Sequence, residues 1–328
     1  MELSWTAATL KARPLPRVPR RHSSDPDTRN RLTGQSTTGS ITTASASGSG
    51  GAPEAPPRDS LFRGTRPLKR WRYVAIFSDE LMACAALVRI GPARQSFWAL
   101  HVRGEGIERE HTRLLPRRAE VQLPAGRAAD GSGSSQPGRM RISDRGVELD
   151  VELDEDAGFE ARCPSGRAEV WTRKQAGIAA RGTLALDGAP PRRIEARAVI
   201  DDTSGHHARE TEWWWTAGVG ESANGLAVAW NLVSGVNDPP TGSERAVWLA
   251  GRPSEAAPVE FAADLSSVSC EDGSELRFAA EMQRSRRDNL LLVSSDYTAP
   301  FGTFSGTLPG GVPLASGLGV VEHHRARW

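Results

Sequence analysis

The chain is poor in cysteine and has no long apolar run, and each shortage excludes a class of protein. Its three cysteines lie far apart and form no CxxC pair, which excludes zinc and redox motifs and indicates reduced thiols. No run of about 18 apolar residues is present, so we expect no transmembrane helix. The N-terminal sequence MELSWTAATLKARPLPRVPRR lacks the continuous apolar segment of a secretory signal. We therefore expect a cytoplasmic protein that is not a membrane protein.

Charge of one sign is not in excess either. Lys plus Arg is 41 and Asp plus Glu is 40, which gives a net charge of +1 and no electrostatic footprint for nucleic acid. Only Lys11, Lys69 and Lys174 are lysines. Together with the many Ala, Gly and Pro residues, this usage is typical of a bacterial chain from a high-GC genome.

No strong catalytic signature is present. The chain has no GxSxG, no P-loop, no HExxH and no dinucleotide fingerprint after a strand. The glycines of GVGESANG join two β patterns and predict a hairpin loop. We expect no cofactor and no metal site, and the sequence does not specify an oligomeric state.

Two segments have the composition of unfolded chain. Residues 1–60 are rich in Ser, Thr, Gly, Ala and Pro and cannot bury enough apolar surface to offset the entropy of ordering. We expect this segment to be a disordered tail. A second polar stretch, residues 124–138, predicts a mobile loop between strands.

The remaining sequence has the two-residue period of β-strands. In residues 147–154, Val and Leu alternate with Glu and Asp, which is typical of a half-buried antiparallel strand. Residues 194–200 and 226–232 alternate in the same way, and the best helix candidate, EMQRSRRDNLL, is poor. We predict an all-β fold of two consecutive antiparallel β-barrel or sandwich halves, residues 61–195 and 196–328, with little helix.

The run Glu212–Trp215 supplies candidate chemistry. In a strand, Trp213 and Trp215 share one face, and Glu212 and Trp214 share the other. Glu212 is a catalytic candidate, because an acid among aromatic side chains would have a raised pKa. Trp213 and Trp215 are ligand-binding candidates. The alternative is a core tryptophan pair with Glu212 on the solvent side.

Two further segments of the C-terminal half contain candidate ligand-binding residues. His206 and His207 end the polar segment that begins at Asp201, where carboxylates and imidazoles could bind a ligand or form a simple polar turn. Trp230 and its neighbour Asn231 lie in an apolar strand, and Asn237 lies in the following loop. Asn231 either orients a ligand or ties two strands together.

The C-terminus ends in EHHRARW. Alternation places Glu322 and His324 on one face and His323 on the other. Glu322 and His324 form a plausible acid–base pair and are catalytic candidates, while His323 is a ligand-binding candidate. A salt-bridged chain end is the alternative. We expect the three segments 206–215, 230–237 and 322–328 to meet around one cavity, because polar groups buried together can satisfy one another.

Several long motifs resemble a known family. WRYVAIFSDELMACAALVRIGPARQSFW, HHARETEWWWTAGVGE and AWNLVSGVNDPPTGSE are similar to the bacterial family called domain of unknown function 2804. The resemblance spans residues 64–328. A more distant similarity is to the lipocalin-like carotenoid hydratase (hydroxyneurosporene synthase) and tocopherol cyclase group. That similarity implies two lipocalin-like barrels and a hydrophobic, isoprenoid-like ligand.

These observations favour two functions of different classes. The first is binding of a hydrophobic small molecule in an aromatic-lined barrel cavity. The second is an isomerase, hydratase or cyclase in which a buried carboxylic acid, Glu212 or Glu322, protonates such a ligand. A structural protein with no small-molecule site is a third possibility.

Overall fold

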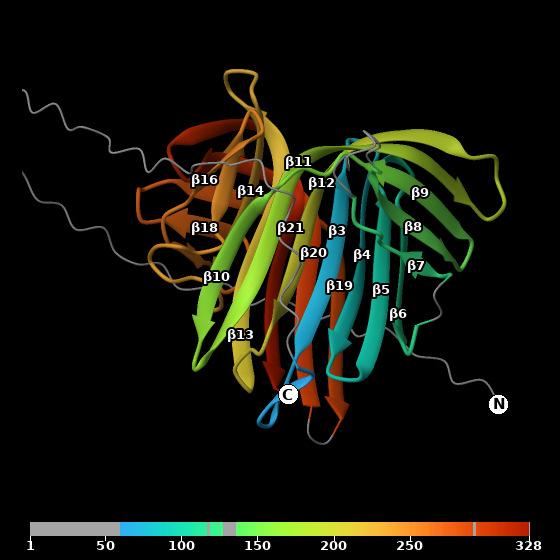
Figure 1. Ribbon diagram of the computed structural model, residues 1–328. Coiled ribbons are helices and arrows are strands. Elements are labelled where there is room, and N and C mark those ends of the chain that lie inside the picture. Colours follow the sequence, from blue (N-terminus) through green and yellow to red (C-terminus); the bar gives the residue numbers. More distant parts are fainter. Residues whose placement is uncertain (1–59, 117–118, 127–135, 291–292, 328) are drawn as a thin grey trace, which may run out of the picture. The chain divides into compact units, whose positions relative to one another are not determined.

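The computed structural model describes residues 60–116, 119–126, 136–290 and 293–327, of which 71% lie in β-strands and 1% in helix. The predicted disordered tail, apart from Ser60, lies outside the described residues. So does the centre of the predicted loop, residues 127–135. The described part confirms the predicted all-β fold, with two antiparallel sheets that each curl into a half barrel (Figure 1).

The first sheet has ten strands in the order β6-β5-β4-β3-β12-β11-β9-β8-β7, with β10 paired to β11. Its strands are β3 (Lys69–Phe77), β4 (Leu81–Ile90), β5 (Ala93–Val102), β6 (Ile107–Leu114), β7 (Val121–Gln122), β8 (Gly138–Asp144), β9 (Val147–Leu153), β10 (Phe159–Ser165), β11 (Ala168–Leu186) and β12 (Arg192–Gly205). A short 3-10 helix, Arg103–Glu105, joins β5 to β6.

The second sheet has nine strands in the order β16-β15-β14-β13-β21-β20-β19-β18-β17. Its strands are β13 (Glu210–Ser222), β14 (Ala227–Ser234), β15 (Ala246–Leu249), β16 (Arg252–Glu255), β17 (Val259–Phe261), β18 (Ser267–Cys270), β19 (Glu275–Leu290), β20 (Val293–Leu308) and β21 (Val312–Arg327). Residues 281–290 of the helix candidate EMQRSRRDNLL are part of β19. A separate hairpin pairs β1 (Phe62–Arg63) with β2 (Arg66–Pro67).

The chain passes from the first sheet to the second between Gly205 and Glu210. The expected boundary between residues 195 and 196 therefore falls inside β12. Alternation in β12 continues as far as Gly205, and the strand stays paired with β3 and β11 along that length. The described residues of both sheets belong to one compact unit.

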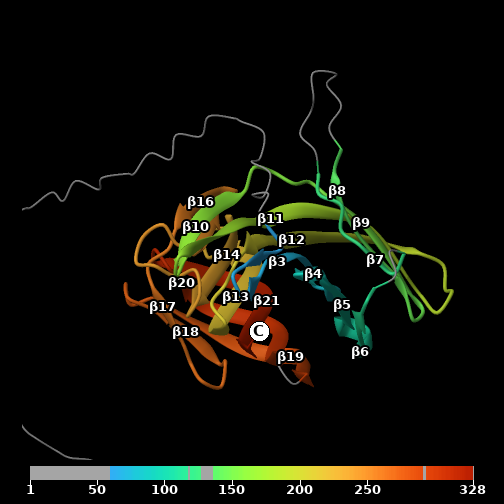
Figure 2. The ribbon, with the colours of Figure 1, turned by 60° about the horizontal axis from the view of Figure 1, so that its bottom comes forward.

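Alternation along the strands divides the apolar side chains into three layers. Val74 and Ile76 of β3 point to the concave side of the first sheet, while Tyr73, Ala75 and Phe77 point to the second sheet. The third layer fills the concave side of the second sheet. The middle layer therefore joins the two sheets, and in Figure 2 β3 and β4 lie beside β13 and β21.

Trp230 shows how closely the second sheet is packed. Its side chain is fully buried in the concave layer, with the indole N–H donating to Thr216 Oγ1 at 3.2 Å. Gly218 is its partner in the ladder, and a Cβ at Gly218 would lie 2.3 Å from the Trp230 ring. Only glycine fits opposite this tryptophan.

Candidate functional site

A cavity of about 330 Å³ lies between the two sheets. Strands β3, β4, β5 and β12 supply most of one wall, and β13, β19, β20 and β21 supply most of the other. The sequence-based expectation of a cavity inside a barrel is corrected on this point, because core side chains occupy the concave side of each sheet. The volume is at the lower end of the roughly 300–1,000 Å³ found for ligand pockets.

Aromatic side chains from both sheets form the walls. Tyr73 meets Trp215 edge to face, with ring centroids 5.6 Å apart. Phe97 meets Tyr297 at 6.4 Å. Both tyrosines of the chain line this cavity, and burial raises the pKa of each well above its ordinary value. The walls are therefore apolar, with uncharged hydroxyl groups.

Ladder pairing sets the order of side chains across the first sheet. Lys174 pairs with Asp201, Asp201 with Tyr73, Tyr73 with Ala86, and Ala86 with Phe97. This row places the ionic residues on the β11 side of the cavity and the phenyl ring on the β5 side. The two sides of the cavity therefore differ in chemistry.

Two carboxylates share one buried ammonium on the β11 side. Lys174 Nζ lies 2.7 Å from Asp201 Oδ1 and 3.2 Å from Glu244 Oε1. Asp201 also accepts hydrogen bonds from the indole N–H of Trp71 and from the Thr203 hydroxyl. Glu244 accepts one from the Asn237 amide at 3.0 Å. Asp201 is therefore the better stabilised of the two carboxylates.

Burial raises the pKa of Glu244, and the negative charge of Asp201 raises it further against the opposing effect of Lys174. The loop between β14 and β15 brings Glu244 to the cavity and is itself held in place. Arg245 donates to the carbonyls of Ala256 and Pro239, and Asn237 adopts a positive φ of 56°. The acid is thus fixed at the cavity wall.

His207 is the second unusual group on this side. Its ring stacks on Trp71 with centroids 5.2 Å apart, and neither ring nitrogen makes a well-formed hydrogen bond among the described residues. Burial lowers the pKa of His207 to about 3, so the ring is neutral. Burial also lowers the pKa of nearby Lys69, which lines the cavity, to about 6. An unpaired buried polar group costs about 1–3 kcal/mol.

Glu322 and His324 lie together on the β21 wall. Glu322 accepts the indole N–H of Trp213 at 2.9 Å, and its carboxylate lies 3.8 Å from His324 Nδ1. His324 Nε2 lies 2.8 Å from the Ser295 hydroxyl, and the imidazole packs on Trp213. Both side chains line the cavity.

Arg284 brings a positive charge to the β5 side. Its guanidinium lies over the rings of Phe97 and Tyr297, at 4.1 and 5.1 Å from their centroids. It also donates to Thr112 Oγ1 at 2.6 Å, and its Nε lies 3.2 Å from Glu110. These contacts hold Arg284 as part of the wall.

Asn231 links the tryptophan wall to the Glu244 loop. Its side-chain oxygen accepts the indole N–H of Trp215, and its amide donates to the backbone carbonyl of Glu244, both at 2.8 Å. The structure therefore gives Asn231 the tying role that the sequence left open. It lies behind the wall and does not line the cavity.

The structure brings together six of the candidates from the sequence and separates five. His207, Trp213, Trp215, Asn237, Glu322 and His324 line the cavity, with contributions from all three expected segments. Glu212, Trp230, Asn231, His206 and His323 do not. His206 instead lies 3.1 Å from the carbonyl oxygen of Ser60.

Glu212 occupies the solvent side of its strand. It bonds His323 at 2.9 Å and Arg325 at 2.6 Å, and these hydrogen bonds lower its pKa. The sequence-based idea of a raised pKa is therefore wrong for this residue. His323 stacks on Trp214 at 4.6 Å on the same face. This group is the salt-bridged chain end that the sequence offered as the alternative.

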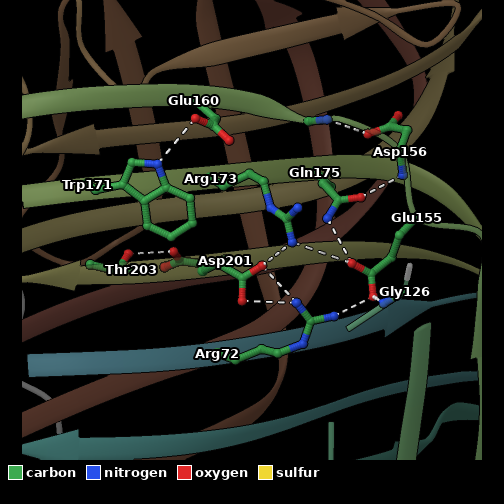
Figure 3. Close-up of polar contacts among 12 residues, drawn as sticks. Arg72, Gly126, Glu155, Asp156, Glu160, Trp171, Arg173, Gln175, Asp201 and Thr203 are labelled. Carbon is green, nitrogen blue, oxygen red and sulfur yellow. Dashed lines mark hydrogen bonds and ion pairs between the residues drawn. The ribbon is translucent and has the colours of Figure 1, made fainter. Parts of the chain in front are cut away.

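The neighbouring carboxylates Asp201 and Asp202 face opposite ways on β12. Asp202 joins an ionic network on the concave side, where it binds Arg72 at 2.7 Å and Arg173 at 2.9 Å. Figure 3 shows Glu155 completing this network between Arg72 and Gln175. The network links β3, β11 and the segment after β9. Of the two aspartates, only Asp201 lines the cavity.

The candidates from the sequence did not include several residues that line the cavity, namely Lys69, Tyr73, Tyr297, Arg284 and Glu244, nor Lys174, which binds two of its carboxylates. Lys174 and Lys69 did carry a signal. They are two of only three lysines in an arginine-rich chain, and both are buried.

Fold and site together define a two-sheet antiparallel β protein with an aromatic-walled cavity between its sheets. Residues 141–328, more than half of the chain, match the family described as "Domain of unknown function (DUF2804)", and the chain belongs to this family. The match is shorter than the resemblance over residues 64–328. No curated protein matches the chain.

Three solved structures are similar to the chain. A candidate AttH from Nitrosomonas europaea has 13% identity over 78% of this chain and 91% of its own, with a TM-score of 0.48. Kievitone hydratase from Nectria haematococca has 9% identity over 79% and 88%, also at 0.48. CghA has 9% identity over 79% and 88%, at 0.44. Identities of this size transfer no activity to the chain.

Among the described residues, no helix is long and apolar enough to cross a membrane. The same residues contain no group of three or more His, Cys, Asp or Glu side chains arranged to hold a metal ion.

Proposed function

We propose that the protein binds an apolar small molecule of isoprenoid or lipid type in the cavity between its two sheets. The observation that carries this proposal is the cavity itself. It offers about 330 Å³ of space, walled by Trp71, Trp213 and Trp215 together with both tyrosines. Its size favours a compact ligand.

Entry to the cavity is on the β5–β6 side. Ala93, Arg94 and Leu114 line the cavity there and are exposed to solvent. Leu114 is 54% exposed, and a large exposed apolar side chain at the edge of a ligand pocket supports entry of an apolar molecule.

A blocked cavity tests the proposal. Val88 lines the cavity from β4, so Val88→Trp fills it, whereas Leu226→Trp adds the same ring at an exposed turn elsewhere. The probe is phenylnaphthylamine, an uncharged apolar fluorophore. We expect saturable binding to the wild type and to Leu226→Trp, and strongly weakened binding to Val88→Trp. Equal binding to all three proteins would contradict the proposal.

A further inference from the structure

The β11 side of the cavity contains buried polar side chains that binding of a purely apolar ligand would not require. Glu244, Asp201 and His207 line the cavity, and Lys174 contacts both carboxylates without lining the cavity itself. Glu244, Lys174 and His207 are at least nine-tenths buried. Trp71 joins them, because its ring stacks on His207 and its N–H donates to Asp201. They form one polar subsite.

The charges of this subsite do not balance if both acids are ionised. One ammonium, Lys174, faces two carboxylates, and its shorter contact is to Asp201. Asp201 also has two further donors, whereas Glu244 has Asn237 alone besides Lys174. A proton retained in the subsite therefore belongs on Glu244. Cys163 on β10 is a further titratable group near this acid, and Asp238 and Arg245 of the Glu244 loop lie near the same thiol.

A neutral carboxyl group differs from a carboxylate because it has an O–H to donate. An acid kept neutral by an apolar site at pH 7 can hydrogen-bond an oxygen of a bound molecule, as in ketosteroid isomerase. His207 supplies an independent sign of a ligand, since both of its ring nitrogens are buried at the cavity and neither makes a well-formed hydrogen bond among the described residues. Its ring has a polar contact with the backbone of Gly205. A neutral imidazole offers one donor and one acceptor.

We propose that Glu244 is a neutral hydrogen-bond donor to the ligand, and that the ligand carries an uncharged oxygen group, a carbonyl or a hydroxyl, held between Glu244 and His207. This inference rests on the proposed function and specifies its ligand class. A carboxylate head group would meet Asp201 and is disfavoured here. The burial that raises the pKa of Glu244 supports the same protonation state.

Infrared spectroscopy tests the protonation state without any ligand. At pH 7 the wild type is expected to show the carbonyl band of a protonated carboxylic acid, and Glu244→Gln is expected to lose it. Asp201→Asn is expected to lose the band too, because Lys174 then pairs with Glu244 alone. Glu255→Gln, whose carboxylate binds Ser243 outside the cavity, is expected to keep it. A wild type without this band, or a band that survives Glu244→Gln, would overturn the inference.

A pair of probes tests the ligand class. Prodan is a neutral naphthyl ketone whose emission shifts to the red when its carbonyl accepts a hydrogen bond, and a naphthalene carboxylate is its charged counterpart. We expect the wild type to bind prodan more tightly than the carboxylate, with an emission shift that Glu244→Leu abolishes. Tighter binding of the carboxylate, or equal emission in both proteins, would overturn the inference. If phenylnaphthylamine binds but prodan does not, the ligand class is wrong and the binding cavity stands. Failure of phenylnaphthylamine would instead contradict the proposed function.

Discussion

The indole N–H of Trp215 donates a 2.8 Å hydrogen bond to the side-chain oxygen of Asn231, and both side chains are buried where the two sheets meet. The Asn231 amide continues the link to the backbone carbonyl of Glu244. One asparagine thus connects the aromatic wall of the cavity to the loop that carries its acid.

Asn231→Leu removes both hydrogen bonds at nearly constant volume. It leaves the Trp215 N–H and the Glu244 carbonyl buried without partners, so we expect the free energy of unfolding to fall by about 3 kcal/mol. Urea denaturation measures this loss. Trp215→Phe in the Asn231→Leu background removes one stranded donor and is expected to recover part of it. A loss in Asn231→Leu no larger than that of an exposed substitution would refute the linking role.

Lys174→Met leaves Asp201 and Glu244 facing each other without the shared ammonium. Removing one member of a buried ionic group costs about 3–5 kcal/mol, and thermal or urea unfolding should show a loss of that size at pH 7. The double variant Lys174→Met, Asp201→Asn removes the stranded charge as well, so it should be more stable than Lys174→Met alone. If the double variant is the less stable of the two, Asp201 is not the main partner of Lys174.

His207 makes stability depend on pH in a defined direction. Its folded pKa is about 3 and its ordinary value is 6.5, so between these pH values the unfolded chain binds a proton that the folded chain does not. Stability should therefore fall as the pH is lowered below 6.5, by about 2 kcal/mol at about pH 5 from this residue. His207→Phe keeps a ring against Trp71 and should flatten this slope. Leu226→Phe, at an exposed position where no titratable group is changed, is the control and should retain the slope.

Glu212 and Glu322, the two candidate acids from the sequence, should differ in their effect on probe binding, because only Glu322 lines the cavity. Glu212→Gln alters a half-exposed group bonded to Arg325, so phenylnaphthylamine binding should be unchanged. Glu322→Leu removes the acceptor of the Trp213 N–H at the cavity wall, so the probe's affinity or emission should change. Fluorescence titration compares the two variants. An effect of Glu212→Gln as large as that of Glu322→Leu would place the site elsewhere.

The fold could be predicted because period-two alternation is a local property of a half-buried strand. The same rule correctly placed Trp213 and Trp215 on one face and Glu212 on the other. It could not locate the cavity between the sheets. Alternation shows that the two faces of a strand differ, but it does not show which face packs against the other sheet. The pairing of Lys174 with Glu244 depends on how the β14–β15 loop folds back, and no local pattern encodes that contact.

The most direct test of the account is mass spectrometry of small molecules that copurify with the full chain and with Val88→Trp from the native host. We expect an apolar molecule with a carbonyl or hydroxyl group in the wild type and its loss from Val88→Trp. The same molecule in equal amounts on both proteins, or no molecule on the wild type, would contradict the claim that the cavity between the sheets is a ligand site.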